Sequence, residues 1–223
     1  MRMLAVFRKG ERLRHIGHLD IMRAMQRALR RSGVPVAYSN GFNPHMLLTF
    51  ASALSVGASG ERELMDVTLE REMTAGDFLA TMNPALPPDL QLVAARVIDD
   101  RHPALMAMVQ AAVYDITLLD KTAADACRAA LPAFLAQEEI LAERKTKSGV
   151  KEVNIRPWIF ELTMEGATLH GVLALSETEN CKPDMLLTAL SAFAGCEKPR
   201  ASVTRLGLMG RDAEGALAEL EGL

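Results

Sequence analysis

Short runs of alternating apolar and polar residues, separated by amphipathic segments, fill the first hundred positions of the chain. Strand-like runs occur at 3–8, 34–39, 46–51, 63–70 and 90–98. Residues 12–16 are expected to extend the first strand or to pair with it. The segments between Asp20 and Gly33 and from Thr74 to Pro84 have helical spacing. The resulting order, β-α-β-β-α-β with small additions, is the ferredoxin-like arrangement.

The same order recurs after Pro103. Strands are expected at 111–119, 152–164, 167–176 and 202–210, and helices at 122–137 and 182–195. The fold class predicted is therefore α+β, with two ferredoxin-like domains in tandem. We expect a basic N-terminal domain at 1–100, a second domain at 107–210, and an acidic tail at 211–223 that forms a short helix or a frayed end. The two halves are not obviously similar in sequence, so the pattern does not establish a repeat.

The first helix carries an unusual set of arginines. At about 100° per residue, four of them fall on one side, opposite an apolar side. These are Arg23, Arg27, Arg30 and Arg31. Asp20 is expected at the N-cap or in the first turn, and Gly33 at the C-terminal end. Like charges four residues apart repel, and no acidic residue is expected on this side to relieve them. The alternatives are an anion-binding surface and an ordinary solvated helix face.

Charge is distributed unevenly along the chain. The formal net charge is −3, but residues 1–50 carry nine basic and two acidic side chains, a net of +7. The remaining residues have a net charge of −10. This asymmetry favours a local basic surface for an anionic partner over a protein that coats nucleic acid generally.

The segment "YSNGFNPH", residues 38–45, follows the helix and is rich in turn-forming residues. Gly41 tolerates positive φ, Asn43 can bond to nearby backbone, and Pro44 fixes its own φ. Tyr38, Phe42 and His45 supply flat groups for stacking or hydrogen bonding. Arginines that hold phosphate beside an aromatic side chain that stacks on a base make a sound RNA-binding arrangement. A rigid hairpin loop without a ligand is the alternative.

In the second half, two basic features stand out. Arg156 precedes Pro157 within an apolar segment, where it needs an acidic or anionic partner. A Ser148-Gly149 turn is surrounded by Arg144, Lys145, Lys147 and Lys151, which fits a solvated hairpin tip.

Several functional classes lack support in the sequence. No run of about 18 apolar residues exists and the N-terminus has no signal-peptide core, so we expect a cytoplasmic protein without membrane contact. The three cysteines, Cys127, Cys181 and Cys196, have no metal-site spacing and are expected to be small buried residues rather than a disulfide framework. No GxSxG, Walker or GxGxxG motif occurs.

A metal site is the less favoured interpretation of the N-terminal histidines. His15, His18, Asp20 and His45 supply suitable ligand types, but helix capping is the simpler role for His18 and Asp20. We therefore assign no metal site.

Residues 7–63, from "FRKGERLRHIGHLD" through "RRSGVPVAYSNGFNPH" to "SVGASGERE", resemble the radical-SAM-associated (radical-SAM-linked) protein family, a domain of unknown function. "EVNIRPWI" resembles a second motif of that family. Asn40 stands where the family pattern has Gln, and Met46-Leu47-Leu48 replaces a more polar stretch. The positions that match are His18, Asp20, Arg27, Arg30, Arg31, Tyr38, Ser39, Gly41, Phe42, Asn43, Pro44, His45 and Arg156.

The resemblance implies a stand-alone partner of a radical S-adenosylmethionine (radical-SAM) protein. This chain lacks the three-cysteine cluster motif, so we expect no cofactor here, and an iron–sulfur cluster and S-adenosylmethionine in the partner. The resemblance to this family implies no particular reaction for the matching residues.

Three functional hypotheses remain open. The first is a non-catalytic accessory protein that holds RNA or another anionic substrate through Arg23, Arg27, Arg30, Arg31, Tyr38, Ser39, Asn43, His45 and Arg156. The second is an RNA-processing or RNA-modifying enzyme with His18 or His45 as general acid or base. The third is a structural interaction module whose motif residues support the fold.

Overall fold

The computed structural model describes residues 1–146 and 149–222 and confirms the α+β class. The chain divides into two compact units, the first formed by residues 1–109 and 207–223 and the second by residues 110–206. The chain therefore enters the second unit after Val109 and returns to the first within strand β10.

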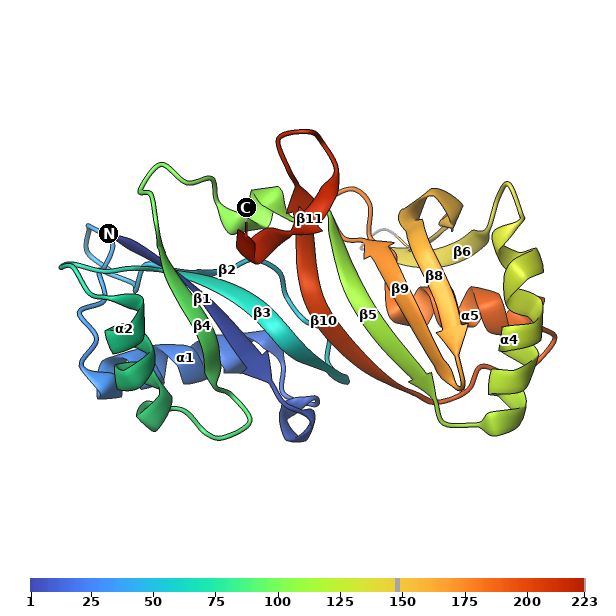
Figure 1. The fold of residues 1–223 in the computed structure, drawn as a ribbon, viewed down its shortest axis with the longest axis horizontal. Coiled ribbons are helices and arrows are strands. Elements are labelled where there is room, and N and C mark those ends of the chain that lie inside the picture. The colour runs from blue at the N-terminus through green and yellow to red at the C-terminus, as the bar shows by residue number, and fades with distance from the viewer. Residues whose placement is uncertain (147–148, 223) are drawn as a thin grey trace. The chain divides into compact units, whose positions relative to one another are not determined.

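The first unit contains an antiparallel sheet in the order β4-β1-β3-β2. Its strands are β1 (Arg2–Lys9), β2 (Leu48–Phe50), β3 (Ala58–Thr68) and β4 (Leu92–Ile98). Its helices are α1 (His18–Ser32), α2 (Ala75–Met82) and the short α3 (Leu105–Met108). Figure 1 shows α1 and α2 beside these strands, where both helices contribute to one apolar core.

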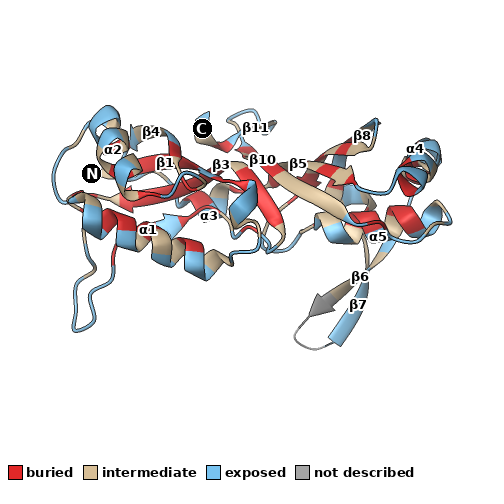
Figure 2. Cartoon of the chain, turned by 90° about the horizontal axis from the view of Figure 1, so that it is seen from below, coloured by how far each residue is buried: buried red, intermediate tan, exposed pale blue. Residues whose placement is uncertain are grey.

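Strand alternation and helix periodicity together produce this core. Met3, Ala5 and Phe7 project from one face of β1 and pack with Met65 and Val67 of β3. The apolar side of α1 adds Ile21, Met25, Ala28 and Leu29, all buried. Figure 2 shows the buried residues on β1 and β3 and the exposed outer side of α1. Burial of apolar surface stabilises the fold by about 25 cal/mol per Å². Burial of this apolar side of α1 therefore leaves the opposite, arginine-bearing side of the helix facing solvent.

The second unit has the strand order β10-β5-β9-β8, and a separate β6-β7 hairpin lies outside that order. Pairs β5–β9 and β8–β9 are antiparallel. The strands are β5 (Ala111–Leu118), β6 (Leu141–Thr146), β7 (Gly149–Asn154), β8 (Ile159–Glu165), β9 (Thr168–Ala174) and β10 (Ala201–Arg211). The helices are α4 (Lys121–Leu135) and α5 (Pro183–Phe193).

Local signals located several element ends correctly. Gly33 ends α1 with φ of 76°, as expected for a left-handed C-terminal residue. Thr74 caps α2, because its hydroxyl accepts a hydrogen bond from the Asp77 backbone N–H. Asp20 lies in the first turn of α1, whereas the N-cap is Gly17.

Four local expectations were wrong, and two of them involve proline. Residues 12–16 form no strand, because a 3₁₀ turn covers Glu11–Leu13. Residues 34–39 form isolated bridges at Val36 and Tyr38 instead of a continuous strand. Pro35 has no backbone N–H to donate to a neighbouring strand, which disfavours a continuous strand here. The expected strand at 152–164 is interrupted by a 3₁₀ turn at Arg156–Trp158 that contains Pro157.

The fourth correction concerns the C-terminal tail. It forms strand β11 (Leu217–Glu219), antiparallel to β10, followed by a 3₁₀ turn at Leu220–Gly222. The Asp212 carboxylate accepts hydrogen bonds from the N–H groups of Glu214 and Ala216, and Gly215 adopts φ of 84°. These contacts form a tight turn between β10 and β11. The acidic composition of the tail did not predict this turn.

Candidate functional site

All four arginines predicted for the outer side of α1 are exposed. We call Arg23, Arg27, Arg30 and Arg31 the arginine face. Two of them have partners in the fold: Arg23 forms a 3.0 Å ion pair with Asp20, and Arg31 donates to the Ala85 carbonyl oxygen. The expectation that no acidic residue relieves this face was therefore wrong for Arg23.

Arg27 and Arg30 differ from their neighbours. Within the described residues, neither forms an ion pair or a side-chain hydrogen bond. They lie three residues apart on one helix, so their guanidinium groups project from adjacent positions on the same side. This pair is the part of the arginine face that is available to an external anion.

The loop at 38–45 is held closed at its base by Ser39 and His45. The Ser39 backbone N–H donates to the His45 carbonyl at 2.9 Å, and the His45 N–H donates to Ser39 Oγ at 3.1 Å. Ser39 Oγ also lies 2.8 Å from His45 Nδ1. Ser39 and His45 were both predicted to bind an anion. In the structure their polar groups bond to each other and hold the loop in shape.

Beyond this base, the loop exposes its aromatic side chains. Phe42 is fully exposed at 110% and Tyr38 is 41% exposed. Gly41, next to Phe42, adopts φ of 120°, a conformation that residues with a side chain rarely adopt. Asn43 is also exposed. A large apolar ring entirely in solvent is a surface that a partner can cover.

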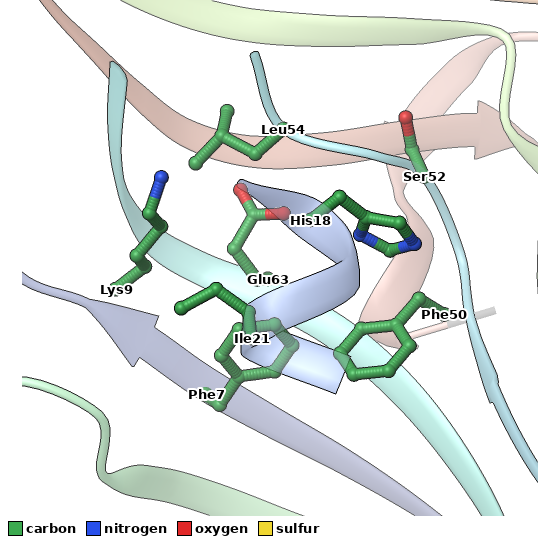
Figure 3. A pocket seen from close by; sticks show the side chains of 8 residues that line it. All are labelled: Phe7, Lys9, His18, Ile21, Phe50, Ser52, Leu54 and Glu63. Atoms are coloured by element: carbon green, nitrogen blue, oxygen red, sulfur yellow. The ribbon is translucent and has the colours of Figure 1, made fainter. Parts of the chain in front are cut away.

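A small polar cavity lies at the start of α1 (Figure 3). Its polar lining is Lys9, His18, Ser52 and Glu63, and its apolar lining is Phe7, Ile21, Phe50 and Leu54. About 10 Å³ is open to the centre of a water molecule, which is room for one. His18, the first residue of α1, packs edge-on against the Phe50 ring at 5.2 Å.

Two oppositely charged residues of this cavity are almost completely buried. Lys9 and Glu63 are each 2% exposed. Lys9 Nζ donates to the carbonyl oxygens of Arg14 at 3.2 Å and Ala58 at 3.1 Å. A Cβ added at Gly60 would lie 2.6 Å from Glu63 Oε1, so glycine makes room for this carboxylate. Burying both charges together offsets part of the desolvation cost of each.

The sequence predicted a functional role for His18 but not for Lys9, Ser52 or Glu63. A signal was present for the two charged residues. Side chains two residues apart in a strand point to the same face. Lys9 is two residues from the buried Phe7, and Glu63 is two residues from the buried Met65. Each therefore places a charged group on the buried face of its strand. The carboxylate, imidazole and ammonium groups around this water-sized space are of types that can donate or accept a proton in catalysis.

The histidines do not assemble into a metal site. His45 belongs to the loop that follows α1, whereas His18 begins that helix, which at 15 residues spans about 22 Å. Among the described residues, no group of three or more His, Cys, Asp or Glu side chains could hold a metal ion.

Arg156 has a structural partner in the second unit. Its Nε donates to the Leu135 carbonyl at 3.0 Å, and its Nη1 to the Ile159 carbonyl at 3.4 Å. The expected acidic or anionic partner is thus replaced by backbone oxygens. Of the basic hairpin tip, Lys147 and Ser148 lie outside the described residues, and Arg144 stacks on Trp158 at 5.9 Å.

Together these features define an α+β protein with an exposed basic helix face, a braced aromatic loop and a small cavity with polar and apolar walls. The chain belongs to the DUF2344 family, described as uncharacterized proteins conserved in bacteria, which matches residues 2–183. No match is found among curated proteins. No helix in the described part of the chain is long and apolar enough to cross a membrane.

Proposed function

We propose that this protein is a cytoplasmic accessory protein that holds RNA on the arginine face and the 38–45 loop while acting with a radical-SAM protein. The observation that carries the RNA proposal is the exposure of Arg27 and Arg30 without a partner among the described residues. Two adjacent guanidinium groups that the fold does not use are suited to bidentate contacts with phosphate.

The loop supplies the second element of this binding mode. Phe42 and Tyr38 present aromatic surface beyond the Ser39–His45 base. Stacking of a base on an aromatic ring contributes about 1–3 kcal/mol and accepts any base. Phosphate contacts from the helix combined with stacking from the loop fit a single-stranded RNA.

We also propose that each unit is ferredoxin-like. The strand orders β4-β1-β3-β2 and β10-β5-β9-β8 support this proposal, because both correspond to the order 4-1-3-2 when the strands of each unit are numbered along the chain. Fold alone does not specify function, so the RNA proposal rests on the exposed residues of α1 and the loop.

The radical-SAM partner is proposed from the sequence resemblance of residues 7–63. In this proposal the partner carries the iron–sulfur cluster and S-adenosylmethionine. A pull-down from native extract with the tagged chain tests it: recovery of a radical-SAM protein supports the association, and its repeated absence at low salt rejects it.

A salt titration of RNA binding tests the surface. Wild type is compared with Arg27→Ala/Arg30→Ala in filter binding to single-stranded RNA. Loss of two phosphate contacts should lower the slope of log K against log salt concentration by about 1.4, at about 0.7 per contact. Arg71→Ala/Arg101→Ala is the matched control, because both arginines are exposed in the first unit. Equal slopes in the two double variants would refute the assignment.

A second candidate function is RNA processing or modification with His18 as general acid or base. The cavity around Lys9, Ser52 and Glu63 favours it, because a carboxylate beside an imidazole can orient the ring and stabilise its charged form. Turnover of RNA by the purified chain, lost in His18→Asn but retained in His15→Asn, is the result expected. No turnover by the wild-type chain, alone or with a radical-SAM partner, eliminates this candidate.

A further inference from the structure

Two of the three cysteines meet in the second unit although 69 positions separate them in sequence. Cys127 lies in α4 and is fully buried, and Cys196 follows α5 and is partly exposed. Burial raises the pKa of the Cys127 thiol and Cys196 contributes to the rise, so the two side chains lie close to each other. A disulfide requires two such side chains to bring their sulfurs to about 2.05 Å, with Cα atoms usually about 4.4–6.8 Å apart.

Independent packing contacts fix this juxtaposition. The end of α5 turns back at Gly195, with φ of 68°, and the Cys196 N–H donates to the Ser191 carbonyl at 3.0 Å. Ser191 is buried, its hydroxyl donates to the Leu187 carbonyl at 2.7 Å, and it lies near enough to Cys127 to offset part of the rise in that thiol's pKa, which burial causes. Ala123 lies one turn before Cys127 on α4 and lines the same surface hollow as Cys196.

The hollow gives one of the two sulfurs access to a reagent. It has a volume of about 690 Å³, within the range of small-ligand sites, and Cys196 is in its wall. Lys198 and Arg200 line it as well, although Lys198 also pairs with Asp184. Asp120 and Glu197 also line the hollow, so its wall carries both signs of charge. A low-molecular-weight disulfide that carries both carboxylates and ammonium groups, such as glutathione disulfide, matches this mixed lining.

We propose that Cys196 and Cys127 form a reversible redox site, in which a low-molecular-weight disulfide converts the two thiols into an intramolecular disulfide. The Cys196 thiolate attacks one sulfur of the reagent, forms a mixed disulfide and releases the first thiolate. Cys127 loses its proton and attacks Cys196 Sγ, which releases the second thiolate. The two protein thiols are oxidised, the reagent is reduced to two thiols, and the two cysteine protons pass to the released thiolates.

The order of attack follows from the environments of the two sulfurs. Burial, with a further contribution from Cys196, raises the pKa of Cys127 to about 11, so Cys127 is a protonated thiol at neutral pH. Cys196 is the sulfur at the surface and therefore reacts first. Cys127 then acts as the resolving thiol, and its proximity compensates for its low thiolate fraction.

Cys181 provides a matched control within the same unit. It is 1% exposed, and burial raises its pKa to about 12. Neither of the other two cysteines contributes to that shift. Substitution of Cys181 should therefore leave the redox behaviour unchanged.

The test is an intact-mass titration of the full chain with increasing ratios of glutathione disulfide to glutathione. The wild type and Cys181→Ser should lose the mass of two hydrogens, and a peptide map should show Cys127 joined to Cys196. Cys127→Ser should instead gain one glutathionyl group at Cys196, and Cys196→Ser should show neither change.

The wild-type peptide map is decisive even if a variant fails to fold. Oxidation should also raise the melting temperature by about 10 °C, because the bond closes a long loop, and a reductant should reverse the rise. A wild-type chain that retains three free thiols at the highest ratio, or that accumulates the glutathione adduct without closing the bond, overturns the proposal.

Discussion

Replacement of Lys9 by methionine is the sharpest test of the polar cavity at the start of α1. The change keeps the length of the aliphatic chain but removes the ammonium group that donates to the Arg14 and Ala58 carbonyls. Hydrogen bonds from a charged donor contribute about 1.5–3 kcal/mol each. The loss of two therefore predicts a decrease of about 3–6 kcal/mol in the free energy of unfolding.

The carboxylate of Glu63 allows a double-mutant cycle. Lys9→Met leaves Glu63 buried beside an apolar side chain, whereas Lys9→Met/Glu63→Gln removes both charges from the cavity. The double variant should be less destabilised than the sum of the single variants by at least about 1 kcal/mol, because both side chains line one cavity and neighbouring residues couple.

Urea denaturation followed by circular dichroism measures these differences. Lys121→Met is the control, since Lys121 is exposed and its replacement should change stability by no more than about 0.5 kcal/mol. The account of the cavity is refuted if Lys9→Met behaves like this control, or if the effects of the two cavity substitutions simply add.

Three further predictions concern single residues. Phe42→Ala should leave stability within about 0.5 kcal/mol of wild type in urea denaturation, because the ring is fully exposed, while RNA affinity in filter binding falls about tenfold. Unchanged affinity would remove the loop from the proposed interface. Arg156→Ala should lower stability by about 1–3 kcal/mol, because the Leu135 and Ile159 carbonyls lose their hydrogen-bond donor, and it should leave RNA affinity unchanged. Unchanged stability with weaker RNA binding would instead show that Arg156 is a binding residue. Thr74→Ala should cost about 1 kcal/mol in thermal unfolding by removing the cap of α2, and a neutral result would mean that packing alone holds this helix.

The sequence was most informative where structure depends on local signals. The apolar spacing of α1, its end at Gly33 and the cap at Thr74 each involve residues within one or two turns of each other. The arginine face followed from the same spacing, but the partners of two arginines did not. Asp20 was within reach of a local argument, whereas Ala85 approaches Arg31 only through tertiary packing.

Features that depend on distant contacts were not predictable in the same way. The alternation of side chains along a strand predicts that Lys9 and Glu63 are charged residues on buried faces. It does not predict that the pairing of β1 with β3 brings both to one cavity with His18. Asn154 illustrates a second limit. Its side chain accepts hydrogen bonds from the Ile140 and Arg156 N–H groups and, with Pro157, breaks an apolar run that otherwise favours a strand.

The central claim, that α1 and the following loop hold RNA, is tested most directly by ultraviolet cross-linking of the wild-type chain to single-stranded RNA with peptide mapping. The account predicts nucleotide adducts on the peptide that contains Tyr38 and Phe42, and their loss when Arg27 and Arg30 are both replaced by alanine. Adducts confined to residues 110–206, or adducts on the loop that persist undiminished in the double variant, would contradict it.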